Sequence, residues 1–357
     1  MRAPGWLGER ETTPLRRTLL LPVAALAQLY GLGARFHRAA YRSGWLEARA
    51  LPCRVVSVGS LAAGGSGKTP LAAWLAAGLH ARGRRVALAS RGYGRRGGGA
   101  VEVVSDGVTV LCGPERAGDE PLLLAAQAPG VPVLVARDRG AAGLCAVERF
   151  GTEILVLDDG FQHHRLRRDL NLVVLDGAAG LGGGAVLPRG PLREPPGALG
   201  LADAIIVMDG PLPPADEARV AALAPGAARF AARRVPRSLR RLGATGEEPP
   251  AVLRGAEVGM LCGIARPASF RATLEALGAR VVAERLFPDH HTFRSRDLRG
   301  LAGAARRWVT TEKDAVKLDP AWCGELDLSV LAIAVEGAEG LVERVLARLA
   351  QPRPAAR

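Results

Sequence analysis

The sequence contains almost no lysine and few aromatic residues. Among 357 residues, three lysines stand against 45 arginines, and aromatic residues make up 4%. The net charge of +13 indicates an anionic partner: nucleic acid, a phosphorylated substrate or an anionic membrane surface. So few aromatics leave no evident platform for stacking bases, and we expect no nucleic-acid partner. Where arginine is so favoured, a retained lysine indicates a site that needs a flexible point charge rather than a planar fork.

Closely spaced cysteines are also missing. The five cysteines are scattered along the chain: Cys53, Cys112, Cys145, Cys262 and Cys323. This spacing argues against a disulfide framework or a zinc knuckle, and we expect buried thiols in a reducing compartment.

The N-terminal region has no apolar run long enough to cross a bilayer. Its apolar stretch, residues 18–34, is shorter than the ~20 residues that a span needs, and Pro22 and Gly31 interrupt it. Arginines flank it on both sides. We therefore expect residues 1–45 to include a helix that lies in the membrane interface, with Leu26, Leu29 and Phe36 on its apolar side. A helix packed on the protein's own core and a cleaved signal peptide are the alternatives.

A glycine-rich loop follows the first apolar strand, at residues 55–58. Its candidate phosphate-binding residues are Ala62, Ala63, Gly64, Gly65, Ser66, Gly67, Lys68 and Thr69. A helical run begins directly after them, and strand, glycine-rich turn and helix form the setting of a phosphate-binding loop. There Lys68 reaches the terminal phosphoryl group and Thr69 offers a hydroxyl to Mg²⁺. Ala62 stands where the strict pattern has glycine, and a turn that only joins strand to helix is the alternative.

Strand and helix patterns alternate along most of the chain. The strands are expected near 54–59, 85–90, 132–136, 153–157, 171–175 and 203–208, with helices near 68–82, 119–127 and 139–150. This order predicts an α/β fold, a P-loop NTPase-like, mostly parallel sheet with helices on both faces, over residues 46–225. A second, smaller α/β lobe is expected over 226–357. Its strands are expected at 257–262, 280–284, 307–311 and 328–334, and its helices at 267–277, 295–306 and 339–350.

Two segments between these elements are rich in proline. Residues 180–200 are too rich in glycine and proline for regular structure, and this composition is typical of a functional loop. Residues 211–250 are expected to form a connector with a few strands.

Several polar residues stand where strands end or helices begin. Asp158 and Asp159 end an apolar strand, the usual place for a second Mg²⁺ ligand, although a polar turn is the alternative. Asp119 and Glu120 open a helix, where carboxylates also serve as caps. Three other residues are candidates: Arg137 for phosphoryl contact, Tyr93 for stacking or phosphate contact, and His290, beside Asp289, as part of a general base.

Seven motifs in order carry a family resemblance. They are residues 64–70 (GGSGKTP), 90–94 (SRGYG), 118–121 (GDEP), 157–163 (LDDGFQH), 188–195 (PRGPLREP), 287–291 (FPDHH) and 309–317 (VTTEKDAVK). Together they resemble the tetraacyldisaccharide 4′-kinase family, from about Arg16 to near the C-terminus. Ser60 is one departure, since the family usually has asparagine there.

The resemblance implies a reaction and a place for it. It implies transfer of the γ-phosphoryl group from Mg·ATP to the 4′-hydroxyl of a lipid A disaccharide 1-phosphate, between two α/β lobes around a cleft. It places the protein, expected to be a monomer, on the cytoplasmic face of the bacterial inner membrane.

The resemblance also implies roles for the candidate residues. Asp119 matches the proposed base, with His290 assisting it. Thr69, Asp158 and Glu120 are the candidate metal ligands, with Asp159 beside them and Lys68 on the phosphate. Arg137, Tyr93 and Arg193 match residues that line the donor and acceptor sites.

Two rival classes share the loop. The first is a soluble kinase or ligase that acts on a small metabolite, but this class does not explain the apolar, arginine-flanked N-terminal region. A nucleic-acid-dependent ATPase is suggested only by charge. Residues 311–314 (TEKD) faintly resemble a guanine-recognition loop, but they lie in the second lobe, so GTP specificity is not expected.

Overall fold

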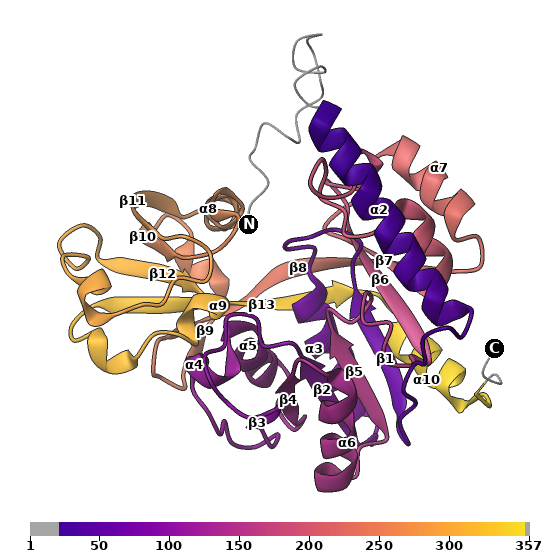
Figure 1. Cartoon of the computed structure of the whole chain (residues 1–357). Helices are drawn as coiled ribbons and strands as arrows, with labels where there is room; N and C mark the ends of the chain where they lie inside the picture. Colours follow the sequence, from indigo (N-terminus) through magenta and orange to yellow (C-terminus); the bar gives the residue numbers. More distant parts are fainter. Residues whose placement is uncertain (1–20, 354–357) are drawn as a thin grey trace.

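The computed structural model describes residues 21–353. Within these residues, 13 strands form one continuous sheet that joins two α/β lobes (Figure 1). The strand order is β11-β10-β12-β13-β8-β7-β6-β1-β5-β2-β4-β3, with β9 paired to β8.

The first lobe is a mostly parallel sheet. Its strands are β1 (Arg54–Gly59), β2 (Val86–Ser90), β3 (Val101–Ser105), β4 (Val133–Ala136), β5 (Ile154–Asp158), β6 (Leu170–Asp176) and β7 (Ala204–Met208). Only the edge strand β3 runs antiparallel to its neighbour in this set. All six strands predicted for this lobe are confirmed, and the added strand β3 lies at the sheet edge.

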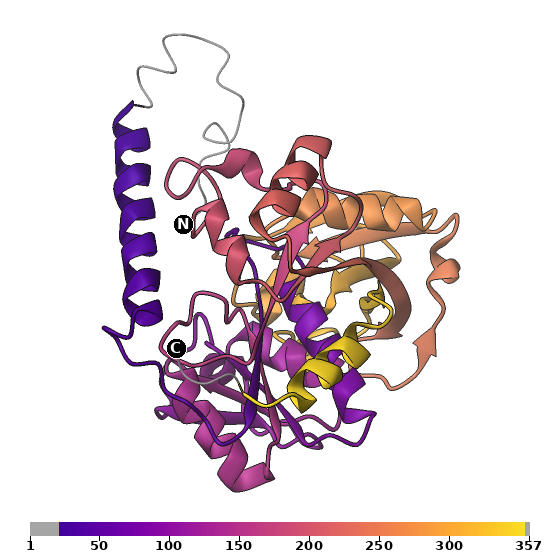
Figure 2. The same ribbon diagram turned by 90° about the vertical axis from the view of Figure 1, so that its right-hand side faces the viewer.

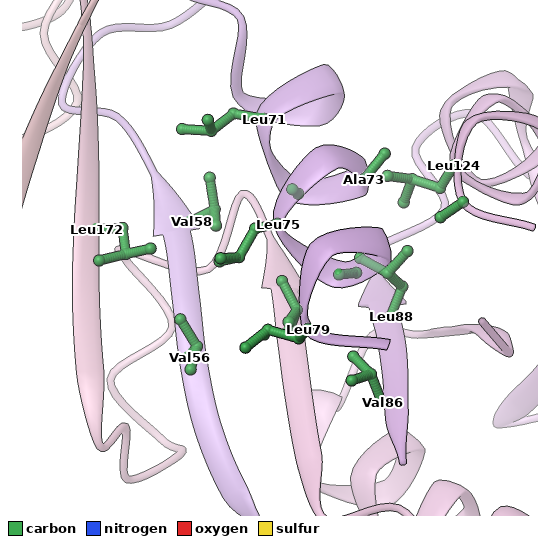
Figure 3. Packing of buried hydrophobic residues seen from close by; sticks show 14 of the residues in the cluster. Val56, Val58, Leu71, Ala73, Leu75, Leu79, Val86, Leu88, Leu124 and Leu172 are labelled. Atoms are coloured by element: carbon green, nitrogen blue, oxygen red, sulfur yellow. The ribbon is translucent and has the colours of Figure 1, made fainter. Parts of the chain in front are cut away.

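Helices cover both faces of the first lobe because its strand residues alternate between two cores. In β1, Val56 and Val58 pack with α3 (Lys68–His80), whereas Val55 packs on the opposite face with α6 (Arg139–Phe150). Such alternation is the period of two of a strand that is buried on both faces. Figure 3 shows the α3 leucines against the strands. Three further helices of this lobe are α4 (Pro114–Ala117), α5 (Asp119–Gln127) and α7 (Pro214–Leu223).

Two long strands join the lobes. β8 (Ala228–Arg241) continues from the first lobe into the second, and β13 (Asp327–Gly337) returns antiparallel to it. The second lobe adds β9 (Glu247–Glu248), β10 (Glu257–Cys262), β11 (Arg280–Leu286), β12 (Arg307–Thr311), α8 (Pro267–Ala276) and α9 (Glu312–Ala315). β10 and β12 run parallel to β13, so their carboxyl ends point toward the first lobe, and β7 runs toward the second. Ligand sites in α/β sheets form at these ends, and here both sets face one junction.

Two expectations for the second lobe need correction. The expected helix at 295–306 is only a 3₁₀ turn, Ser295–Leu298, because Gly300 adopts a left-handed φ of 79° and ends the run. The last helix, α10 (Leu341–Ala350), belongs to the second α/β unit by sequence order. Its Val342 and Val345 nevertheless pack in the core of the first lobe, which the chain re-enters along β13.

The N-terminal helix α2 (Leu21–Arg42) stands along one side of the first lobe (Figure 2). Small residues face the protein, with Ala27 buried in a core cluster and Gly31 close to Val186 and Pro195. The large apolar residues face outward: Leu26, Leu29 and Phe36 are 57%, 65% and 65% exposed. One side of the helix therefore packs on the protein's own core, and the other side is exposed. Residues 1–20 of the expected 1–45 region lie outside the described residues.

None of the described helices combines the length and the hydropathy that crossing a bilayer would require.

Candidate active site at the junction of the lobes

The glycine-rich loop has the backbone shape of a phosphate-binding loop. Gly64 and Gly67 adopt left-handed φ values of 111° and 86°, and α3 begins directly after Gly67. Residues with a Cβ rarely adopt such values, which explains the two glycines. The amide N–H of Ala63 donates to the carbonyl of Pro191 (2.8 Å), so the expected functional loop at 180–200 braces the phosphate loop. Ser60, the departure from the family pattern, accepts the amide N–H of Ala62 through its hydroxyl.

Lys68 and Arg193 converge on Asp159. The Lys68 ammonium lies 3.7 Å from one oxygen of this carboxylate, and the Arg193 guanidinium donates to the other at 2.6 Å. Burial opposes ionisation of Asp159, but these two cations hold its pKa below the usual range. Two cations beside the glycine-rich loop form a setting that suits polyphosphate.

Thr69 faces the other strand-end carboxylate. Its hydroxyl lies 3.2 Å from Asp158, which is 1% exposed. Burial, the nearby Glu120 and the adjacent Asp159 raise the pKa of Asp158 to about 7. Burial likewise raises the pKa of Glu120. Carboxylates packed together without matching charge resist ionisation, and a cation between them removes that cost.

This donor set fits Mg²⁺. A hydroxyl and carboxylate oxygens are the ligands that this ion prefers, and it usually takes only one or two carboxylates from the protein. The part of the chain that the structure describes holds no cluster of three or more His, Cys, Asp or Glu side chains that could hold a metal ion. Thr69 and Asp158 would hold the ion, with Glu120 beside them.

Asp119 and His290 form a pair across the two lobes. Asp119 opens α5 of the first lobe, and His290 Nδ1 lies 2.9 Å from its carboxylate. Burial opposes ionisation of Asp119, but His290 and two nearby lysines hold its pKa below the usual range. The same hydrogen bond raises the pKa of His290. The contact therefore favours the ionised form of Asp119 and the protonated form of His290, and Glu120 interacts electrostatically with both of them and with Asp159.

Sequence reasoning missed the two lysines beside this pair. Lys313 lies 3.9 Å from Asp119 and 3.0 Å from Asp289, and Lys317 lies 3.8 Å from Asp119. The motif at 309–317 brings both from the end of β12. The scarcity of lysine was the signal that could have found them, because all three lysines of the chain lie here.

The remaining candidates differ in position. Arg137 is exposed, and no contact places its side chain beside the carboxylates. Arg139, two residues on, is 6% exposed and interacts electrostatically with Asp158 and Asp159. Tyr93 is 60% exposed, and its ring lies 5.3 Å from that of His290.

Two site residues have strained backbones. Asp159 and His290 adopt positive φ values of 54° and 62°. Such values are uncommon outside glycine and cluster at functional sites, where the surrounding structure holds them.

A glycine-rich loop ahead of a helix, a strand-end carboxylate beside the threonine of that loop, and a carboxylate–imidazole pair are together typical of a P-loop phosphotransferase. The model of the family described as LpxK, tetraacyldisaccharide-1-P 4′-kinase, matches residues 16–350. The chain belongs to this family and is a kinase.

Relatives and a solved structure agree with the match. Proteins named tetraacyldisaccharide 4′-kinase are 45% identical in Anaeromyxobacter sp. strain Fw109-5, over 97% of this chain and 96% of the relative. They are 41% identical in Geobacter sulfurreducens, over 85% of each chain. The crystal structure of LpxK from Aquifex aeolicus in complex with ATP has a TM-score of 0.77 at 32% identity, and covers 94% of this chain and 99% of that one.

Proposed function

We propose that the chain transfers the γ-phosphoryl group of ATP to the 4′-hydroxyl of tetraacyldisaccharide 1-phosphate. The observation that carries the proposal is the Asp119–His290 pair at the lobe junction, where Glu120 interacts electrostatically with this pair and with the strand-end Asp159. The names of the relatives support the acceptor, and the ATP in the Aquifex aeolicus structure supports the donor.

Asp119 is the general base in this proposal. As the sugar oxygen bonds to the γ-phosphorus, the bond from that phosphorus to the bridging oxygen of ADP breaks, and the hydroxyl proton passes to Asp119. His290 orients the carboxylate through its Nδ1 contact. A positioned base of this kind contributes roughly 10²–10⁴-fold.

Lys68 and Arg193 bind the phosphate charge. Both already face Asp159, so their cationic groups are held in place before any phosphate arrives. Fixed charges of this kind stabilise a transferring phosphoryl group without reorganisation. Mg²⁺, held by Thr69 and Asp158, would neutralise charge on the phosphate oxygens.

The exposed side of α2 supports a place at the membrane surface. Leu26, Leu29 and Phe36 form an apolar side that suits the interface, where an acylated substrate presents its sugar. We place the protein, as a monomer, on the cytoplasmic face of the inner membrane, where ATP is supplied.

The test compares acceptors. With ATP, the protein should consume nucleotide when the acylated disaccharide 1-phosphate is offered in vesicles. A water-soluble sugar alcohol and DNA should leave the rate at its background. Equal or greater stimulation by either of these acceptors would overturn the proposal and favour one of the rival classes.

A further inference from the structure

An arginine of the second lobe lines the same small cavity as the phosphate loop. Arg266 follows β10 and directly precedes α8. It lines a small cavity of about 50 Å³ together with Ala62, Ala63, Gly64 and Ser66 of the phosphate loop. A residue 200 positions from the loop thus shares a wall with it, because the carboxyl ends of β10 and of the first-lobe strands face one junction.

Asp176 holds this arginine. It ends β6, and one of its oxygens accepts the amide N–H of Ala179 at 2.9 Å. Its other oxygen accepts from Arg266 Nη1 at 3.0 Å. The Asp176 side chain is 12% exposed and that of Arg266 is 56% exposed. A buried carboxylate therefore holds one side of a guanidinium whose other side is accessible.

The loop that carries Arg266 is fixed at its other end. The amide N–H of Gly263 donates to Asp314, which is fully buried and pairs with Lys317 at 2.9 Å. Lys317 in turn lies 3.8 Å from Asp119. Asp314 therefore holds both the start of the loop that carries Arg266 and Lys317 beside the proposed base.

The negative charge of Asp176 on the cavity wall requires a cation such as Arg266 if a phosphate is to bind there. Among the described residues that line the cavity, Asp176 is the only charged one besides Arg266. A polyphosphate beside Asp176 would be repelled unless a cation stood between them. A guanidinium carries five N–H donors, so Arg266 can keep its contact with Asp176 and still bind a phosphate oxygen.

We propose that Arg266 is a further substrate-binding residue, which contacts the polyphosphate of ATP from the second lobe while Asp176 positions it. The inference rests on the proposed function only in taking ATP as the donor. Bound nucleotide thereby bridges the lobes, with Lys68 on one side and Arg266 on the other.

The test measures nucleotide affinity in the full chain. Arg266→Ala should raise the Kd for ATP about tenfold or more, which is the loss of one charge-assisted contact. The Kd for AMP, which lacks the β- and γ-phosphates, should change less than threefold. Arg266→Lys, which keeps the charge without the fork, should lie between the two. Arg271→Ala is the matched control, because Arg271 lies on α8 and pairs only with Glu275 and Glu284 among the contacts of the described residues.

Two results would overturn the inference: unchanged ATP affinity in Arg266→Ala, or equal weakening of ATP and AMP, which a merely structural role predicts. Binding separates the inference from the proposed function. A wild-type protein that binds ATP through Arg266 but does not phosphorylate the glycolipid would refute only the latter.

Discussion

The three lysines of the chain all lie beside acidic side chains at the lobe junction: Lys68 near Asp159, and Lys313 and Lys317 near Asp119. The composition alone indicated that each lysine has a special place. It gave no partner, because Asp119 and Lys317 are far apart in sequence and meet only when β12 turns its carboxyl end to the first lobe.

Of the two arginines that follow β4, Arg139 and not Arg137 lies beside the site aspartates. Both follow β4, and the motif singled out Arg137. Asp138 caps α6 by accepting the amide N–H of Gly140, and the chain turns there into the helix. Arg137 thereby stays exposed and Arg139 is buried beside the aspartates. A sequence pattern cannot tell which of two arginines, two positions apart at a strand–helix turn, points to the site.

Replacing the proposed base tests its role directly. Asp119→Asn keeps the shape and removes the proton acceptor, so kcat should fall roughly 10²–10⁴-fold, the general-base range. The KM for ATP should change little. Steady-state kinetics with the lipid acceptor measure both, and near-normal kcat in this variant would rule out the base.

The raised pKa of Asp158 predicts how the free energy of unfolding depends on pH. Its pKa is raised to about 7 in the folded protein, so the unfolded chain loses this proton near pH 4 and the folded chain only near pH 7. Stability is therefore lost as pH rises through that window. Without metal at pH 8, Asp158→Asn should be more stable than wild type by on the order of 1 kcal/mol, a rise in Tm of about 2–4 °C.

The metal should reverse this difference. Mg²⁺ and ATP should raise the Tm of wild type more than that of Asp158→Asn, because the variant lacks the carboxylate that would hold the ion. Thermal unfolding at pH 5 and pH 8 provides the measurement. A variant less stable than wild type at pH 8 without metal would contradict the raised pKa of Asp158.

At the scale of elements, the strands of the first lobe were predictable because each is a short apolar run between helical runs. The absence of the helix expected at 295–306 was not predictable, because the apolar residues of this segment have the spacing of a helix. Leu298, Leu301 and Ala305 do reach the core around Trp308, but from turns rather than from a helix. Gly300 interrupts the run, and local spacing alone does not show whether a glycine ends a helix.

The helix α2 has one side that packs and one that does not. Replacing Leu26, Leu29 and Phe36 together by serine removes exposed apolar surface and should leave the fold intact. Burying such side chains contributes about 1.5–3 kcal/mol each, so vesicle binding should fall at least tenfold. Sedimentation with vesicles measures it.

A matched control for α2 lies in the first lobe. Val108 and Val110 are 93% and 55% exposed on the loop after β3. Their replacement by serine removes exposed apolar surface from another part of the molecule and should leave vesicle binding unchanged. Equal loss in both variants would show that general surface hydropathy, and not α2, carries the binding.

On the scale of the whole molecule, two lobes meet so that their strand ends face one another (Figure 1). The order of strands in sequence predicted two α/β units, but not this opposition. The direction of the second unit depends on β13 pairing antiparallel with β8, which is a long-range contact. The same pairing returns the chain to the first lobe, where α10 completes its core.

The net charge of +13 makes a prediction at this scale. Binding to anionic vesicles should weaken as NaCl rises from about 0.1 to 0.5 M, because salt screens attraction between surface charges. Binding to zwitterionic vesicles should be weaker and nearly independent of salt. Anionic-vesicle binding that salt does not change would assign the interaction to the apolar side of α2 alone.

Transfer to one defined oxygen is the central claim, and the position of the new phosphate tests it most directly. The protein is incubated with ATP and tetraacyldisaccharide 1-phosphate, and the lipid product is examined by ³¹P and ¹H NMR. Wild type should form a second phosphate monoester coupled to the 4′-proton of the sugar, and Lys68→Ala should form none. A phosphate on any other oxygen, or ATP turned over to free phosphate while the lipid stays unchanged, would contradict this claim.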